Sequence, residues 1–125
     1  MPLQSFEEKE KGVGLKYKTF DEDEYIIIHS VLTDECIDDC REKAQKTGKF
    51  KSDVFTFELI TAMVMNYRIL NPDGTEWKLT KDSLSKAPSS FRQWLSAELD
   101  KCDGSLAKGA IKTVAGVEVT FREAA

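Results

Sequence analysis

The chain has 125 residues, the size of one folded domain, and 41% of them are hydrophobic. With 18 basic and 22 acidic residues the formal net charge is −4, which argues against general nucleic-acid binding because phosphate recognition usually needs a basic surface. The first residues lack the apolar core of a signal peptide, no apolar run is long enough to span a bilayer, and the cysteine number is odd. We therefore expect a cytoplasmic protein without membrane association.

The amino-terminal part is expected to form a hairpin. Residues 1–12 are polar and predict a flexible tail, followed by a single domain over residues 13–125. Apolar and polar residues alternate from Val13 to Phe20, and Tyr25 to Leu32 is rich in β-branched residues. Both patterns predict strands, which pair across the acidic turn of residues 21–24.

Two helices are predicted next. Thr33 is a candidate N-cap for a charged helix that runs to about Lys46. A second helix begins at Ser52 or Asp53 and runs through Tyr67. Because this helix is apolar over most of its circumference, it is predicted either to be the central buried helix or to offer its excess apolar face to a partner.

Turn chemistry marks the following segment. Asn71–Gly74 places Pro at the second turn position and Gly at the fourth, and its flanks, Arg68–Leu70 and Thr75–Leu79, are expected to pair briefly. Thr80 is then the predicted N-cap of a short helix over Lys81–Lys86.

The carboxyl-terminal part predicts one more helix and one more hairpin. The helix opens at Ser89 or Ser90, carries an apolar face, and ends near Gly104. Residues 110–121 predict two short strands around Ala115–Gly116. The predicted fold is therefore α+β, with an N-terminal β-hairpin, three to four helices around a central apolar helix, and a short C-terminal β-hairpin.

No pattern of catalytic or metal-binding residues stands out. His29, the only histidine, lies in an apolar strand, which favours a structural role. Cys36 and Cys40 share a helix face but lack enough further ligands for zinc. The acidic run of residues 21–24 lacks the glycine and glutamate offsets of a calcium loop. We expect no enzyme activity, no metal and no cofactor.

One basic group stands beside aromatic residues. Lys46, Lys49 and Lys51 flank Phe50 and lie close to Phe55, a combination also found on surfaces that bind single-stranded nucleic acid. Because Phe55 falls on the apolar face of the predicted central helix, a place in the core is favoured, and no nucleic-acid partner is expected.

The order of these features resembles the tail assembly chaperones of long-tailed bacteriophages. An apolar helix (Phe57–Val64) runs into a turn with Asp73–Gly74, a short segment (Leu79–Leu84) and a closing amphipathic helix (Phe91–Leu99), all after an N-terminal β element. The resemblance covers about Tyr25–Leu106. It implies a non-enzymatic protein of the host-cell cytoplasm that self-associates, coats the apolar helical tape measure protein and helps to recruit tail tube protein.

The first hypothesis is therefore a protein-binding factor in phage tail assembly that forms homo-oligomers through the helices Ser52–Tyr67 and Ser90–Cys102. The candidate protein-binding residues are Phe55, Met63, Met65, Tyr67, Trp77 and Trp94. The alternative is a structural virion subunit, either a tail tube or a head–tail joining protein, which the two hairpins favour.

A further alternative is a small ligand-binding domain or enzyme whose site forms only in three dimensions. Its polar groups would be His29, Asp73, Glu76 and Lys78.

Overall fold

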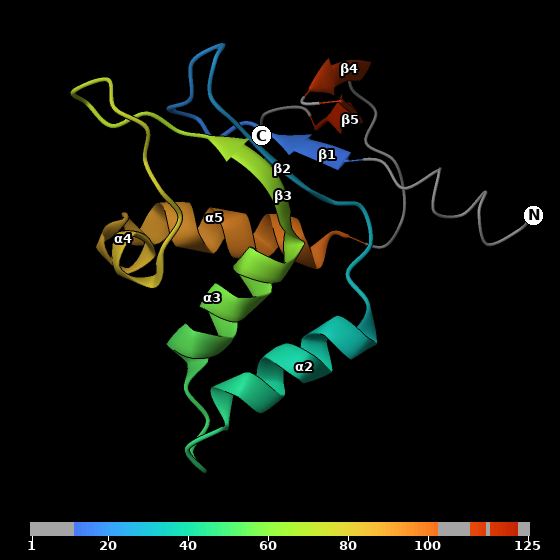
Figure 1. Cartoon of the computed structure of the whole chain (residues 1–125), viewed down its shortest axis with the longest axis vertical. Coiled ribbons are helices and arrows are strands. Elements are labelled where there is room, and N and C mark those ends of the chain that lie inside the picture. Colours follow the sequence, from blue (N-terminus) through green and yellow to red (C-terminus); the bar gives the residue numbers. More distant parts are fainter. Residues whose placement is uncertain (1–11, 103–110, 115, 123–125) are drawn as a thin grey trace, which may run out of the picture.

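A computed structural model describes residues 12–102, 111–114 and 116–122 of the chain, which form a mixed sheet and four helices (Figure 1). The α+β class is therefore confirmed. The elements are β1 (Gly12–Leu15), β2 (Tyr25–His29), α2 (Asp34–Ala44), α3 (Ser52–Met63), β3 (Val64–Arg68), α4 (Lys81–Lys86), α5 (Ser89–Asp100), β4 (Ile111–Val114) and β5 (Val117–Phe121). The predicted tail lies outside the described residues except for Gly12, which begins β1.

Both predicted hairpins are present, and they join in one sheet. The strand order is β3-β2-β1-β5-β4. Within it β1 pairs antiparallel with β2, and β4 pairs antiparallel with β5. The link between the hairpins is the parallel pair β1–β5, in which Val13 faces Thr120. The C-terminal hairpin therefore extends the sheet that the N-terminal hairpin begins.

The second predicted helix ends earlier than the sequence suggested. Helix α3 stops at Met63, and the chain continues directly into β3, which pairs antiparallel with β2 from Val64 to Arg68. The predicted helix through Tyr67 is wrong over its last turn. Val64 adopts extended dihedral angles, although its N–H still donates to the carbonyl of Ile60. Pairing with β2 supplies the backbone hydrogen bonds that another helical turn would have supplied.

The core lies between one face of the sheet and the helices. Figure 1 shows α3 and α5 beneath the sheet and α2 alongside α3. Strands β1 and β2 contribute alternate residues to this core, because successive strand residues point to opposite faces. The members with the least exposure are Val13, Leu15, Ile28, Ile60, Leu95 and Leu99.

The predicted caps and the turn are also present. The hydroxyl of Thr33 accepts the N–H of Cys36 at 3.1 Å and caps α2. Thr80 caps α4 in a capping box with Ser83. In the turn after β3, Leu70 pairs with Glu76, which confirms the short pairing expected around residues 71–74.

A buried ion pair fixes the end of β5 to α5. Arg122 donates from Nη1 to Oε2 of Glu98 at 2.6 Å and to the carbonyl of Glu98 at 2.8 Å. The side chains of Arg122 and Glu98 are only 17% and 10% exposed. The backbone N–H of Arg122 also donates to the carbonyl of Gly14 at 2.9 Å, so β1, β5 and α5 meet here.

Candidate functional site

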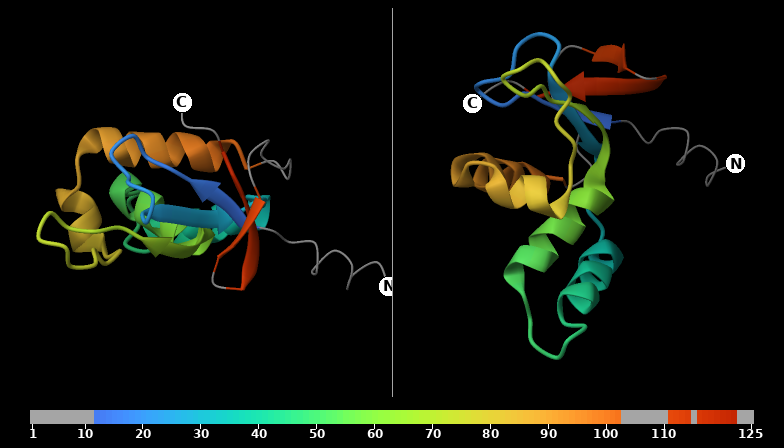
Figure 2. Two further views of the ribbon diagram at one scale, coloured as in Figure 1. Left: turned by 90° about the horizontal axis from the view of Figure 1, so that it is seen from above. Right: turned by 60° about the vertical axis from the view of Figure 1, so that its left-hand side comes forward.

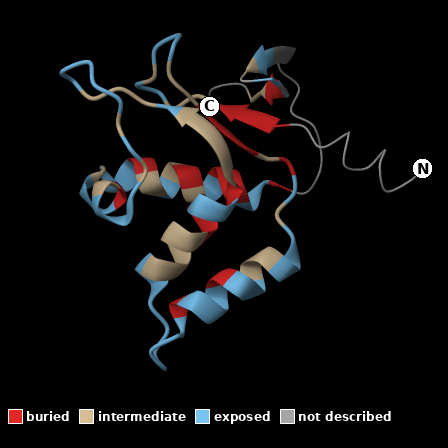
Figure 3. Cartoon of the chain, in the orientation of Figure 1, coloured by how far each residue is buried: buried red, intermediate tan, exposed pale blue. Residues whose placement is uncertain are grey.

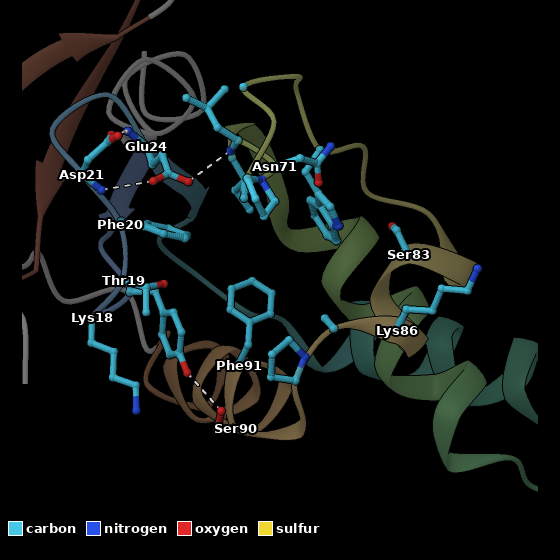
Figure 4. A pocket seen from close by; sticks show the side chains of 18 of the residues that line it. Lys18, Thr19, Phe20, Asp21, Glu24, Asn71, Ser83, Lys86, Ser90 and Phe91 are labelled. Atoms are coloured by element: carbon cyan, nitrogen blue, oxygen red, sulfur yellow. Dashed lines mark hydrogen bonds between the residues drawn. The ribbon is translucent and has the colours of Figure 1, made fainter.

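The described residues form an open cleft of about 1000 Å³. It lies between the β1–β2 loop, the loop from β3 to α4, and the α4–α5 junction (Figure 4). In the second view of Figure 2 both loops rise above the helices. The residues that line it include Tyr17, Phe20, Glu24, Ile69, Trp77 and Phe91.

Aromatic rings form the floor of the cleft. Phe91, at the start of α5, is only 7% exposed and has ring centroids 5.2 Å from Tyr17, 6.4 Å from Phe20 and 6.4 Å from Trp77. The pairs with Tyr17 and Trp77 are edge-to-face, which is a favourable geometry for aromatic rings. Phe91 is thus a buried anchor around which partly exposed rings are fixed in place.

Glu24 ties two walls of the cleft together. Its Oε1 accepts the N–H of Asp21 at 3.1 Å within the β1–β2 loop. Its Oε2 accepts the N–H of Leu70 at 3.0 Å, from the loop after β3. A carboxylate that accepts backbone N–H groups forms strong hydrogen bonds. One side chain therefore sets the separation of two loops that are far apart in sequence.

Each wall is also fixed locally. In the first loop, the Lys16 ammonium group donates to the carbonyls of Asp21 and Glu22 at 3.0 and 3.1 Å. In the second, Oδ1 of Asp73 accepts the N–H of Thr75 at 3.0 Å and its hydroxyl at 2.6 Å. These hydrogen bonds from Thr75 lower the pKa of Asp73 below its usual value. Both loops have a defined shape before any partner arrives.

The charged side chains divide between two sides of the cleft. Asp21 stands with Glu24 at one side, whereas Lys18 and Lys86 lie away from them, with the rings of Phe20 and Phe91 between (Figure 4). Asp82 also lines the cleft and pairs with Lys86 at 3.1 Å, so Lys18 is the only cation of the lining without an ion pair to a described residue. Glu22 and Asp23, in the same β1–β2 loop, are exposed beside the acidic side but do not line the cleft. The cleft therefore offers an apolar floor with an acidic rim on one side.

Three of the predicted protein-binding residues belong to the aromatic group at this cleft. Trp77 lines it, and the ring of Tyr67 lies 6.2 Å from Trp77 while its hydroxyl accepts the N–H of Leu79 at 2.8 Å. Trp94 packs 5.8 Å from Phe91 and 4.9 Å from Tyr17. All three are half-buried.

The other three lie elsewhere. Met63 is 2% exposed at the end of α3, so its proposed role as a contact residue is wrong: its side chain fills the core. Met65 lies on β3, and its side chain reaches the region of Gly12 on the sheet face away from the helices. Phe55 is on α3 and packs against Phe50 at 5.7 Å, far from the cleft.

The sequence did not single out the residues that build the cleft. Phe20 and Glu24 come from the β1–β2 loop and Phe91 from α5, and none has a local signature of a binding site. The available signal was the aromatic pair Tyr17 and Phe20 in the stretch that follows β1, where a loop has no core of its own to fill.

The polar groups considered for a hidden site lie in different parts of the described structure. His29 ends β2 opposite Gly12, whereas Glu76 and Lys78, 3.4 Å apart, lie beyond the other end of the neighbouring strand. The polar site considered in the sequence therefore does not form. Burial, together with the neighbouring Cys36, raises the pKa of Cys40 to about 11, which disfavours the nucleophilic thiolate.

Within the part of the chain that the structure covers, no three His, Cys, Asp or Glu side chains gather as a metal site would require. In the same residues no helix has the length and apolar character needed to cross a membrane.

A second groove, of about 580 Å³, runs between α3, α4 and α5. Polar side chains line most of it, and Arg92 and Lys81 stand there with Asp53 and Asp100. Because both signs of charge are present and Phe57 is the one aromatic residue in its lining, this groove shows no preference for a class of ligand.

The chain was also compared with protein-family models, with curated proteins and with solved structures, and none of the three comparisons found a match.

Proposed function

We propose that the protein is a non-enzymatic binding factor that holds apolar side chains of a partner protein in the aromatic cleft. The observation that carries the proposal is the floor of partly exposed rings around Phe91, in a cleft whose walls are fixed by Glu24. Such a floor favours apolar side chains.

Two features of the cleft make the free energy of association more favourable. Aromatic side chains dominate protein interfaces because they bury a large area and lose little conformational entropy. Walls that are already ordered reduce the entropy lost on binding. Hydrogen bonds of Glu24, Lys16 and Asp73 supply this order in the free protein.

The setting we propose is phage tail assembly, on the basis of the sequence resemblance. The partners would be the apolar, helical tape measure protein and the tail tube protein, met in the host-cell cytoplasm. An amphipathic helix that enters an apolar groove is a common mode of recognition.

The test is a binding titration followed by fluorescence anisotropy. The probe is a fluorescein-labelled amphipathic helical peptide with Leu and Phe on one face. We expect saturable binding that Phe20→Asp weakens about 30-fold or more, because the substitution places a charge on the apolar floor.

The matched control is Val31→Asp, which changes an exposed valine outside the cleft. Circular dichroism establishes that both variants are folded. Equal affinity of the wild type and Phe20→Asp, or no binding by the wild type, would contradict the proposal. Closed rings of the purified protein in electron micrographs would instead favour the structural virion subunit.

A further inference from the structure

The turn between α2 and α3 exposes an aromatic side chain among lysines. Residues 45–53 are exposed throughout (Figure 3), and Phe50 is 45% exposed. Among the residues the structure describes, Val31 is the only other large hydrophobic residue that is exposed. We call residues 46–51 the basic tip.

The basic tip has a defined shape. The N–H of Lys51 donates to the carbonyl of Ala44 at 3.1 Å, and the N–H of Gly48 donates to that of Gln45 at 2.8 Å. Gly48 has a φ of +88°, which glycine adopts without strain. The ring of Phe50 lies 5.7 Å from that of Phe55. Phe50 is therefore presented on an ordered turn.

The residues that the structure describes do not neutralise its charges. Lys43, at the end of α2, pairs with Glu58 at 3.5 Å. Lys46, Lys49 and Lys51 are exposed and form no ion pair with a described residue. The chain as a whole has a net charge of −4. A local basic group on an acidic protein is suited to an acidic surface.

We propose that the basic tip of one copy docks in the aromatic cleft of a second copy of this chain. Phe50 would lie on the exposed parts of the rings of Phe20 and Trp77, above the buried Phe91. Lys49 and Lys51 flank Phe50 and would meet the acidic rim formed by the β1–β2 loop, whose exposed members include Glu22 and Asp23. The partner surface thus supplies an apolar floor for the ring and opposite charge for its two neighbours.

The positions of the two surfaces make this contact intermolecular. The basic tip lies at one end of the molecule, and the loops of the cleft lie toward the other (Figures 1 and 2). The surfaces are different, so the contact is head-to-tail. A head-to-tail contact leaves one tip and one cleft open in each dimer, and repetition gives chains or closed rings.

The inference rests on the proposed function, because it names an occupant of the same cleft. It also predicts that self-association and the binding of another partner exclude each other. A ligand that binds the cleft more tightly would displace the basic tip. The oligomer would then separate into single copies, each bound to the ligand.

The test measures the average mass of the full chain by light scattering over a range of concentrations. We expect a mass that rises with concentration and falls when salt is added, because exposed charges are screened. Phe50→Asp is expected to weaken association about 30-fold or more. Val31→Asp is the matched control and is expected to associate as the wild type does.

A mixture of two defective variants tests the head-to-tail geometry. Phe50→Asp keeps an intact cleft, and Glu22→Lys/Asp23→Lys keeps an intact tip. Each alone is expected to remain monomeric, and an equimolar mixture is expected to form dimers that grow no further. Circular dichroism of each variant excludes unfolding as the cause.

The result that would overturn the inference is a wild type that stays monomeric, a Phe50→Asp variant that associates normally, or a mixture that forms no dimer. Its failure is distinguishable from failure of the proposed function. If Phe50→Asp has no effect on mass but Phe20→Asp abolishes binding of the labelled peptide, only the occupant is wrong.

Discussion

The two ends of helix α5 contrast in how their side chains are satisfied. At its carboxyl end the buried Glu98 and the partly buried Arg122 are paired at 2.6 Å, and the N–H of Leu32 donates to the carbonyl of Cys102 at 3.0 Å. At its amino end Phe91 supports rings that remain partly open to solvent in the cleft. The polar groups at the carboxyl end already have their partners, whereas the rings at the amino end would be stabilised if further apolar surface covered them.

The contrast shows which chemistry belongs to the fold and which belongs to binding. Buried charges are tolerated only when they are paired, so the pair at the carboxyl end is needed for a stable fold. The buried parts of the rings at the amino end contribute to folding, but their exposed parts do not, and this exposed apolar surface is available to a partner. Substitutions at the two ends should therefore affect different measurements.

The largest expected effect is on stability, at the carboxyl end. Arg122→Met leaves Glu98 buried with only the exposed Lys101 nearby, and we expect a loss of about 3 kcal/mol in the free energy of unfolding by urea. The double variant Glu98→Met/Arg122→Met removes both charges and is expected to be more stable than Arg122→Met. A single variant as stable as the wild type would show that the pair does not hold β5 to α5.

A smaller loss is expected from Gly14→Ala in β1. A Cβ atom at this position would lie 2.5 Å from the Phe121 ring, so either the strand or the ring has to move. We expect a cost of about 1–3 kcal/mol, measured by thermal and urea unfolding. The control combines Gly14→Ala with Phe121→Leu, which removes the ring and should restore part of the stability. Additive losses in the double variant would contradict this explanation.

At the cleft, Glu24→Gln should cost about 1 kcal/mol of stability, because an amide has one oxygen and can accept only one of the two backbone N–H groups. The larger consequence is expected in the titration with the labelled peptide, where the affinity should fall about tenfold as the walls lose their fixed separation. Unchanged affinity would indicate that the loops keep their shape without this link.

The smallest effect concerns thiol reactivity and leaves stability at neutral pH unchanged. Cys36 is half-exposed and should react first with iodoacetamide, whereas Cys40 and Cys102 are buried. Because the pKa of Cys40 is raised to about 11, folding favours its neutral thiol. The stability from this group is complete below the unfolded pKa near 9 and is lost as pH rises toward 11.

The labelling is followed by mass spectrometry across that pH range. Rapid labelling of Cys40 in the wild type at neutral pH would contradict the raised pKa.

Local signals in the sequence predicted much of the fold. Thr33 and Thr80 cap helices where their residue types predict caps, and alternation around Val13 predicted β1. The end of α3 was not predictable in this way, because Met63, Met65 and Tyr67 stand two apart, and the spacing of four from Met63 to Tyr67 fits a helix as well as a strand. The parallel pairing of β1 with β5 joins segments more than a hundred residues apart and has no local signature.

The cleft was less predictable than the fold. Trp77 and Trp94 were named from the sequence because they are large and apolar, but nothing local showed that both belong to one aromatic group with Phe20 and Phe91. Chain topology alone brings these rings together. The link from Glu24 to Leu70 spans 46 positions and is equally invisible in the sequence.

The central claim is that the aromatic cleft is a binding site for protein segments. The most direct test is a titration of the isotope-labelled protein with the amphipathic helical peptide, followed by the chemical shifts of its backbone amides. We expect the amide chemical shifts to change progressively at the start of α5 and in the two loops that form the walls, residues 17–24 and 69–77. Shifts that are absent, or that gather on α2 and the outer face of α3 instead, would contradict it.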